Sequence, residues 1–237
     1  MSESLRPVSV CAFTDQLSPE ERSIFKSLIC EKISEYFDEA NNLSLHGLEE
    51  EDSFFQVASI IRYLTPFHEE IPINGVAYYG RPQWMNATLL MKLQAEALDR
   101  KYQKLDRTDH FLSCGGPVAD ALAINSEIVD FVACHTGKVV PTGIASYLYY
   151  DFAGGGIKPH VDTEVFSINM MLMLRHQVAS EGESSSTVLF PPGLPPEYYK
   201  LQVGEVMLMY GSSTIHTRTM INLSEDIHLL TIGFNRR

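Results

Sequence analysis

Apolar side chains in the first half of the chain recur every three to four positions, which is the spacing of one helix face. The clearest such segment follows Ser18, and Glu21 lies three positions later, as in a capping box around a first-turn proline. This segment predicts a helix from Pro19 to about Ala40, with an apolar stripe made of Ile24, Phe25, Leu28, Ile29, Ile33, Tyr36 and Phe37. Similar patterns predict helices over about 83–105 and 118–137, whereas the acidic stretch 49–52 is expected to be a solvated turn.

After Gly137 the pattern changes to short apolar or alternating runs, separated by glycine, proline and polar turns. Because Tyr, Val, Ile and Thr are frequent in and around these runs, we expect antiparallel strands rather than buried helices. Five or more such strands favour a β-sandwich or a jelly roll. The runs are GIASYLYYDF at 143–152, VFSINMMLMLR at 165–175, STVLFPP at 186–192, EVMLMYG at 205–211 and DIHLLTIGF at 226–234.

Taken together, these patterns predict an α+β protein that is mainly β with a helical N-terminal half. We expect a single domain over 1–237, in which 1–137 is mostly helical support and lid and 138–237 supplies most of the β core. The segment SEGESSS, Ser180 to Ser186, is expected to be an exposed connection with no chemistry of its own.

Composition narrows the classes of function. The chain has 237 residues, 45% of them apolar, and a formal charge of −12, which would repel nucleic acid and anionic lipid surfaces. No apolar run reaches the length of a bilayer span, and the first residues lack the pattern of a secretory signal, so a cytoplasmic protein is expected. The four cysteines form no CxxC pair, which fits reduced thiols and leaves any metal site to histidines and carboxylates.

The triplet His160-Val161-Asp162 is the first candidate for such a site, because residues two apart on a strand point to the same side. With 8 histidines and 30 acidic residues, roughly one such triplet is expected by chance, and a second copy occurs at His68-Glu69-Glu70. Context separates the two copies. His160 follows three glycines and precedes a strongly apolar run, whereas His68 lies between prolines, where an ordinary surface residue is expected.

A third ligand is needed, because two histidines and one carboxylate on one face form a site that binds Fe(II) and leaves positions open for substrate and oxygen. His216 is the candidate, since it follows the turn Gly211-Ser212-Ser213 at the start of an expected returning strand.

These residues resemble the Fe(II)/2-oxoglutarate-dependent oxygenases, especially the prolyl-hydroxylase-like branch with a double-stranded β-helix (jelly-roll, cupin-like) core flanked by helices. The resemblance covers about Tyr147 to Phe234 and includes the H-x-D motif, a G-E turn before an apolar strand, and the distal His216, 56 residues after His160. It implies an enzyme that uses Fe(II), 2-oxoglutarate and O2 to oxidise an unactivated C–H bond, with His160, Asp162 and His216 as iron ligands. Related halogenases replace the carboxylate by a small residue, so Asp162 disfavours halogenation.

The sequence departs from this family where a cation usually binds the distal carboxylate of 2-oxoglutarate, about ten residues beyond the distal histidine. Residues 226–228 are Asp-Ile-His, and no Arg or Lys is present there. Arg218 is the best substitute, because it lies two residues after His216 on the same expected strand face. Alternatively, a shift in register leaves Arg218 outside in a surface salt bridge. Tyr150 and Thr231 are expected to donate hydrogen bonds to a bound carboxylate.

Substrate contacts are expected from the N-terminal half. Arg81 lies in a segment read as a Gly/Pro-rich loop with Tyr78, Tyr79 and Trp84, and an arginine among aromatic rings suits a small carboxylate-bearing substrate such as an amino acid. Local packing of Arg81 is the alternative. Lys158 either faces the cavity or is solvated at its mouth.

Three other functions remain open. An iron oxidase that does not use 2-oxoglutarate, such as a ring-forming enzyme, would explain the missing cation. A non-catalytic jelly-roll binding protein would carry a vestigial metal site, although the complete ligand set argues against this. A protein-modifying prolyl or lysyl hydroxylase is the last, but no peptide-binding module is evident. The sequence does not predict the oligomeric state.

Overall fold

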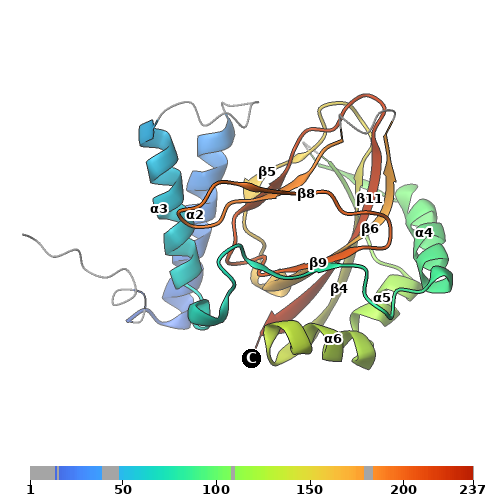
Figure 1. The fold of residues 1–237 in the computed structure, drawn as a ribbon, viewed down its shortest axis with the longest axis horizontal. Helices are drawn as coiled ribbons and strands as arrows, with labels where there is room; N and C mark the ends of the chain where they lie inside the picture. The colour runs from blue at the N-terminus through green and yellow to red at the C-terminus, as the bar shows by residue number, and fades with distance from the viewer. Residues whose placement is uncertain (1–13, 15, 39–47, 108–109, 179–183, 237) are drawn as a thin grey trace, which may run out of the picture.

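The structure, a computed structural model, describes residues 14, 16–38, 48–107, 110–178 and 184–236. Two antiparallel sheets face each other and enclose the interior of the β core (Figure 1). The larger sheet has the order β1-β9-β6-β11-β4-β3-β2, and the smaller has the order β5-β10-β7-β8. The larger sheet consists of β1 (Val76–Gly80), β2 (Leu105–Asp106), β3 (Phe111–Cys114), β4 (Val139–Tyr150), β6 (Ile168–Gln177), β9 (Val206–Met209) and β11 (Asp226–Arg236). The smaller sheet consists of β5 (Ile157–His160), β7 (Thr187–Leu189), β8 (Glu197–Tyr199) and β10 (His216–Arg218).

The central strands of the larger sheet are buried on both faces. On β6, Met171 and Met173 pack between the two sheets, while Met170 and Leu172 pack under the helices on the other side. Such strands read as continuous apolar runs rather than as alternating ones. This explains why INMMLML is a strand although its sequence is also compatible with a buried helix.

Helices cover the outer faces of both sheets. Helices α4 (Ala87–Lys101), α5 (Pro117–Ala123) and α6 (Ser126–Thr136) pack against the larger sheet, whereas α2 (Pro19–Asp38) and α3 (Leu48–Tyr63) form a pair beside β5 (Figure 1). The predicted capping box is present, because the Glu21 N–H donates to Ser18 Oγ at 3.2 Å and the Ser18 N–H donates to Glu21 Oε2 at 2.7 Å. No helix of the described residues has the length and apolar character to cross a bilayer.

Three local predictions for the first half are wrong. Residues 49–52 form the first turn of α3 rather than a solvated turn, because the helix continues to Ala58 and Ile61, which are buried against the smaller sheet. The expected helix over 118–137 is two helices, since the Asn125 side chain accepts the Glu127 N–H and starts α6 there. Tyr78 and Tyr79 lie in β1, an edge strand paired with β9, and not in a loop.

The segment Ser180 to Ser186 is also not the expected exposed connection where the structure describes it. Residues 179–183 lie outside the described residues. Ser185 and Ser186 are buried, with 4% and 5% of their surface exposed.

The predicted jelly-roll core is confirmed by the two sheets, and its interior is where the candidate ligands meet.

Candidate metal centre and its cavity

The three predicted ligands come together at one end of the smaller sheet. His160 ends β5, His216 begins β10, and the two residues are direct partners in the antiparallel pairing. Asp162 lies just beyond β5, where its N–H donates to the Gly211 carbonyl at 2.9 Å. Asp162 Oδ1 is 3.7 Å from His160 Nε2 and 3.6 Å from His216 Nε2, and one ligand atom from each residue lies within 4.8 Å of the other two.

Both imidazoles are held in the tautomer that a metal ligand needs. His160 Nδ1 lies 2.7 Å from the Lys158 carbonyl, and His216 Nδ1 lies 2.9 Å from the Thr214 carbonyl. Because a carbonyl oxygen only accepts, each Nδ1 carries the proton, and each Nε2 keeps its lone pair on the side of Asp162. Hydrogen bonds of this kind orient metal-ligating histidines in general. The donor set therefore fits a divalent metal bound by two Nε2 atoms and one carboxylate.

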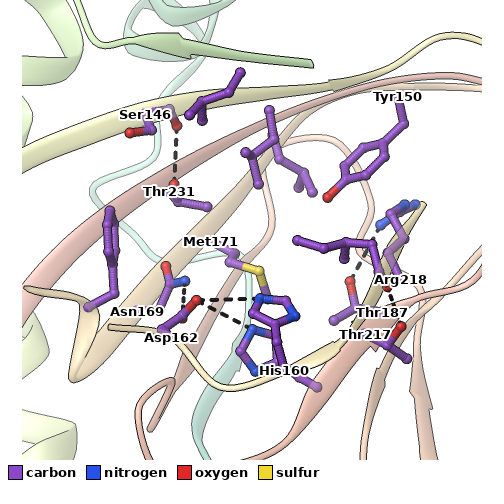
Figure 2. Close-up of a pocket in the computed structure, with 16 residues that line it drawn as sticks. Ser146, Tyr150, His160, Asp162, Asn169, Met171, Thr187, Thr217, Arg218 and Thr231 are labelled. Carbon is purple, nitrogen blue, oxygen red and sulfur yellow. Dashed lines mark hydrogen bonds and ion pairs between the residues drawn. The ribbon is translucent and has the colours of Figure 1, made fainter. Parts of the chain in front are cut away.

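Asn169 orients the carboxylate in the same way. Its Nδ2 donates to Asp162 Oδ2 at 2.7 Å, which leaves Oδ1 facing the two imidazoles (Figure 2). Burial alone would raise the pKa of Asp162, whereas positive charge on the imidazoles of His216 and His160, with the hydrogen bonds that they would then donate, would hold it well below its ordinary value. The sequence analysis missed Asn169, although a single polar residue at the start of the apolar run INMMLML is a usable signal.

The glycine of the G-S-S turn is needed for steric reasons. A Cβ built on Gly211 would lie 2.2 Å from Asp162 Oδ2 and 2.8 Å from the Phe166 carbonyl. Gly211→Ala is therefore expected to displace the Asp162 carboxylate and to weaken Fe(II) binding by about 10-fold, comparable to the loss of an outer-shell partner. Anaerobic Fe(II) titration measures this, with Gly193→Ala as a control for backbone strain without steric contact, because Gly193 has a φ of +69° and no atom within 4 Å of the added Cβ. Equal affinity in Gly211→Ala and wild type would contradict this role.

The metal ligands line a cavity of about 190 Å³ between the two sheets, which Figure 2 shows. The other lining residues are mostly apolar or uncharged: Leu112, Ser146, Leu148, Tyr150, Ile157, Phe166, Asn169, Met171, Thr187, Thr217, Leu229 and Thr231. Arg218 is the only Lys or Arg among the residues that line it.

Arg218 is buried, with 4% of its surface exposed, so the structure does not have it in a surface salt bridge. Its guanidinium donates from one terminal nitrogen to Ser185 Oγ at 2.9 Å and weakly from the other to Thr187 Oγ1 at 3.4 Å. Nε has no hydrogen-bond partner in the part of the chain that the structure describes, and no ion pair joins Arg218 to a carboxylate there. Burial lowers the pKa of Arg218. A buried guanidinium without a carboxylate partner is costly, and a bound anion would offset that cost.

Tyr150 and Thr231 also line the cavity, from opposite parts of it. The centroid of the Tyr150 ring is 5.4 Å from Arg218 Cζ, so Tyr150 lies at the arginine end. Thr231 Oγ1 donates to the Ser146 carbonyl at 3.2 Å, which engages its proton and leaves its lone pairs as acceptors. Of the two, Tyr150 lies nearer the only cation of the cavity.

The predicted substrate residues are not brought to this cavity. A register shift between β10 and β5 places Ile157 and His160 on the cavity side, and Lys158 between them is exposed to solvent. The Arg81 guanidinium lies against Gly204 and donates to the Met85 carbonyl at 3.4 Å. Trp84 packs edge-on against Phe131 of α6, with ring centroids 5.6 Å apart.

The last strand supplies no cation to the interior, as its sequence predicted. Ile227 and Leu229 of β11 point between the sheets, whereas His228 points to the helical side, where it packs edge-on against Tyr149 at 5.0 Å. His228 Nε2 lies 3.1 Å from Lys101 Nζ and 3.2 Å from Asp226 Oδ1. The position used for the usual carboxylate clamp is thus part of a structural network outside the cavity.

This network predicts a dependence of stability on pH. Burial lowers the pKa of His228 from 6.5 to about 4; Lys101 acts in the same direction and Asp226 opposes it. Between these values the unfolded chain binds a proton that the folded chain does not, so the free energy of unfolding decreases as the pH falls from 6.5 toward 4. In wild type the free energy of unfolding decreases between pH 6.5 and pH 5, and in His228→Asn this decrease should be smaller by about 2 kcal/mol, as measured by urea unfolding. Parallel curves for variant and wild type would contradict this.

Comparisons with known proteins support the fold. No family model matches the sequence, and no curated protein matches it. Among solved structures, a prolyl-4-hydroxylase from Pseudomonas putida is 13% identical over 76% of this chain and 98% of its own, with a TM-score of 0.55. HygX from Streptomyces hygroscopicus, with nickel, 2-oxoglutarate and hygromycin B bound, is 11% identical over 69% and 84%, with a TM-score of 0.54.

The epimerase SnoN, in complex with Fe3+, α-ketoglutarate and nogalamycin RO, is 12% identical over 76% of this chain and 84% of its own, with a TM-score of 0.58. At these identities the comparisons establish a shared fold. That fold is the double-stranded β-helix of 2-oxoglutarate and Fe(II) oxygenases, which confirms the predicted fold class.

Proposed function

We propose that this chain, which shares its fold with Fe(II)/2-oxoglutarate-dependent oxygenases, is an enzyme of that kind that acts on a small molecule. The observation that carries the proposal is that one cavity holds both a His-Asp-His ligand set and a buried arginine without a carboxylate partner in the described residues. Iron bound there, with 2-oxoglutarate and O2, would supply the oxidation of an unactivated C–H bond. The proposal covers hydroxylation, desaturation and cyclisation.

His160, Asp162 and His216 would hold the iron. The two Nε2 atoms carry lone pairs because both Nδ1 atoms donate to backbone carbonyls, and Asn169 turns Asp162 so that Oδ1 faces them. These contacts fix the ligand atoms before a metal arrives, which reduces the cost of ordering the site. Three protein ligands leave further coordination positions for the cosubstrate and oxygen.

Arg218 would bind the distal carboxylate of 2-oxoglutarate. Near Tyr150, the residues of β11 that point between the sheets are Ile227 and Leu229, which carry no charge. The cation that would bind the carboxylate therefore comes from β10 instead of the last strand. A guanidinium matches a carboxylate with two parallel hydrogen bonds, and the Tyr150 hydroxyl would add a donor at the same end. The apolar side chains that line the same cavity, such as Leu148 and Ile157, suit the methylene groups of a five-carbon dicarboxylate.

The substrate would present an uncharged group to the metal. About 190 Å³ is less than the roughly 300–1,000 Å³ of pockets that enclose a drug-sized ligand, so cosubstrate and reacting group together would fill the cavity. Arg218 would be engaged by 2-oxoglutarate, and Arg81, Trp84 and Lys158 lie elsewhere, so any substrate carboxylate would stay outside. Asn169 Oδ1 is buried with no partner among the described residues, and it would accept a hydrogen bond from a substrate O–H or N–H.

An iron oxidase that does not use 2-oxoglutarate is the second candidate, because the last strand lacks the usual cation. The buried, unpaired Arg218 favours the first candidate, since it supplies an anion site inside the same cavity. A non-catalytic binding protein is disfavoured, because a vestigial site has no reason to keep hydrogen bonds that orient all three ligands.

Anaerobic Fe(II) titration followed by addition of 2-oxoglutarate tests the proposal. We expect iron to bind and the visible charge-transfer band of chelated 2-oxoglutarate to appear. Iron binding without that band, together with oxygen consumption independent of 2-oxoglutarate, would favour the oxidase. Absence of iron binding would exclude both enzymes and favour the binding protein.

A further inference from the structure

Behind Arg218 lies a second buried carboxylate, that of Glu225, immediately before β11. The residue is 4% exposed, and its Oε1 accepts hydrogen bonds from the Ser185 N–H at 2.8 Å, Ser185 Oγ at 2.7 Å and His176 Nε2 at 2.8 Å. Its Oε2 accepts the Asn222 N–H at 3.3 Å. Burial would raise the pKa of Glu225, but these donors lower it, so the carboxylate is ionised.

The direction of the hydrogen bonds between Glu225 and Arg218 is fixed by chemistry. An ionised carboxylate only accepts, so the single proton of the Ser185 hydroxyl points to Glu225 Oε1. A guanidinium only donates, so the same Ser185 oxygen accepts from the terminal nitrogen of Arg218 at 2.9 Å. Ser185 therefore connects a cation and an anion that form no direct ion pair with each other.

This indirect connection differs from a salt bridge in its consequence for Arg218. A direct pair with Glu225 would occupy two guanidinium N–H groups and satisfy the charge without a ligand. Through Ser185, the negative charge of Glu225 lies close enough to stabilise the buried cation, yet only one terminal nitrogen is used strongly. Nε has no partner in the described part of the chain, and the other terminal nitrogen has only the 3.4 Å contact with Thr187.

We propose that Ser185 and Glu225 are positioning residues that hold Arg218 charged, oriented and ready to bind the distal carboxylate of 2-oxoglutarate. This inference rests on the proposed function and extends it to residues that do not line the cavity. His176 supports the arrangement from β6 by donating to the same carboxylate oxygen. Ser185, which lies shortly before β7, thereby contributes to cosubstrate affinity.

The test is the affinity for 2-oxoglutarate of full-length Fe(II) protein, measured anaerobically through the charge-transfer band. Ser185→Ala and Glu225→Gln should each raise the Kd for 2-oxoglutarate by about 10-fold, the usual effect of losing one charge-assisted hydrogen bond, with the Kd for Fe(II) unchanged. Since both residues act through the same hydrogen-bond chain, the double variant should exceed the larger single effect by less than about twofold. Ser186→Ala is the matched control, because Ser186 is equally buried and has no hydrogen bond to Arg218.

A purely structural role would give a different result. In that case Ser185→Ala and Glu225→Gln would lower the melting temperature and leave the Kd for 2-oxoglutarate at the wild-type value, which would overturn the inference. Ser185→Ala removes only one oxygen, so it distinguishes a positioning role from a purely structural role even where Glu225→Gln fails to fold. Wild-type protein that binds Fe(II) and shows no band would refute the proposed function itself, and the inference with it.

Discussion

Replacing His216 by alanine is expected to abolish Fe(II) binding in the working concentration range and, with it, 2-oxoglutarate turnover. His216 supplies one of three ligand atoms, and the loss of a ligand should cost more than the 10–100-fold that the loss of an outer-shell partner costs. Because the imidazole contacts His160 and Asp162 rather than the main apolar clusters, the fold should be retained. Anaerobic iron titration, with circular dichroism to verify folding, measures both effects.

His68→Ala is the matched control for this experiment. His68 belongs to the other triplet of the sequence in which a histidine is followed two residues later by an acidic residue, and it lies in a short 3-10 helix (His68–Glu70), where its Nδ1 bonds to the Thr65 carbonyl. It is outside the cavity, so its variant should bind iron like the wild type. Wild-type iron affinity in the His216→Ala protein would exclude the proposed metal centre.

Arg218→Leu is expected to raise the Kd for 2-oxoglutarate by about 100-fold, or roughly 3 kcal/mol, because it removes a buried, bidentate partner of a carboxylate. Iron affinity should stay within about twofold of wild type, since Arg218 contacts none of the three ligands. The melting temperature of the metal-free protein should change little, because relief of the desolvation cost of the guanidinium opposes the loss of its hydrogen bonds to Ser185 and Thr187. The charge-transfer band measures affinity, and calorimetry measures stability.

Arg218→Lys separates charge from geometry in the same assay. Lysine keeps the positive charge and loses the planar fork, so its Kd should lie between those of wild type and Arg218→Leu. A Kd for 2-oxoglutarate unchanged in Arg218→Leu would place the carboxylate site elsewhere and would remove the main argument against the 2-oxoglutarate-independent oxidase.

The local chemistry of the site could be predicted because it depends on short-range features of the sequence. His160 and Asp162 are separated by one residue, His216 follows a tight turn, and the apolar runs around them have the length and composition of buried strands. These features are local, and each survives folding with little change. The same holds for the capping box at Ser18 and for the absence of a cation at residues 226–228.

The surroundings of the site could not be predicted, because they depend on pairing between distant strands. A register shift between β5 and β10 turns Lys158 outward, and no local pattern at Lys158-Pro159 reveals it. Tyr78 and Tyr79 form a strand because they pair with the edge of β9. This pairing places Arg81 and Trp84, which follow in the chain, away from the cavity. Ser185 and Glu225 meet their partners across 33 and 40 residues of sequence, respectively.

By itself, then, the sequence determined the fold class and the identity of three candidate ligands, since periodicity and close spacing act over a few residues. Only the tertiary structure decided which polar groups surround them. In the folded protein Arg218 is buried beside Ser185 without a carboxylate partner in the described residues, and Asn169 orients Asp162. The physical reason is that burial and hydrogen-bond partners are set by the register of strands far apart in the chain, and register is a property of the assembled sheets.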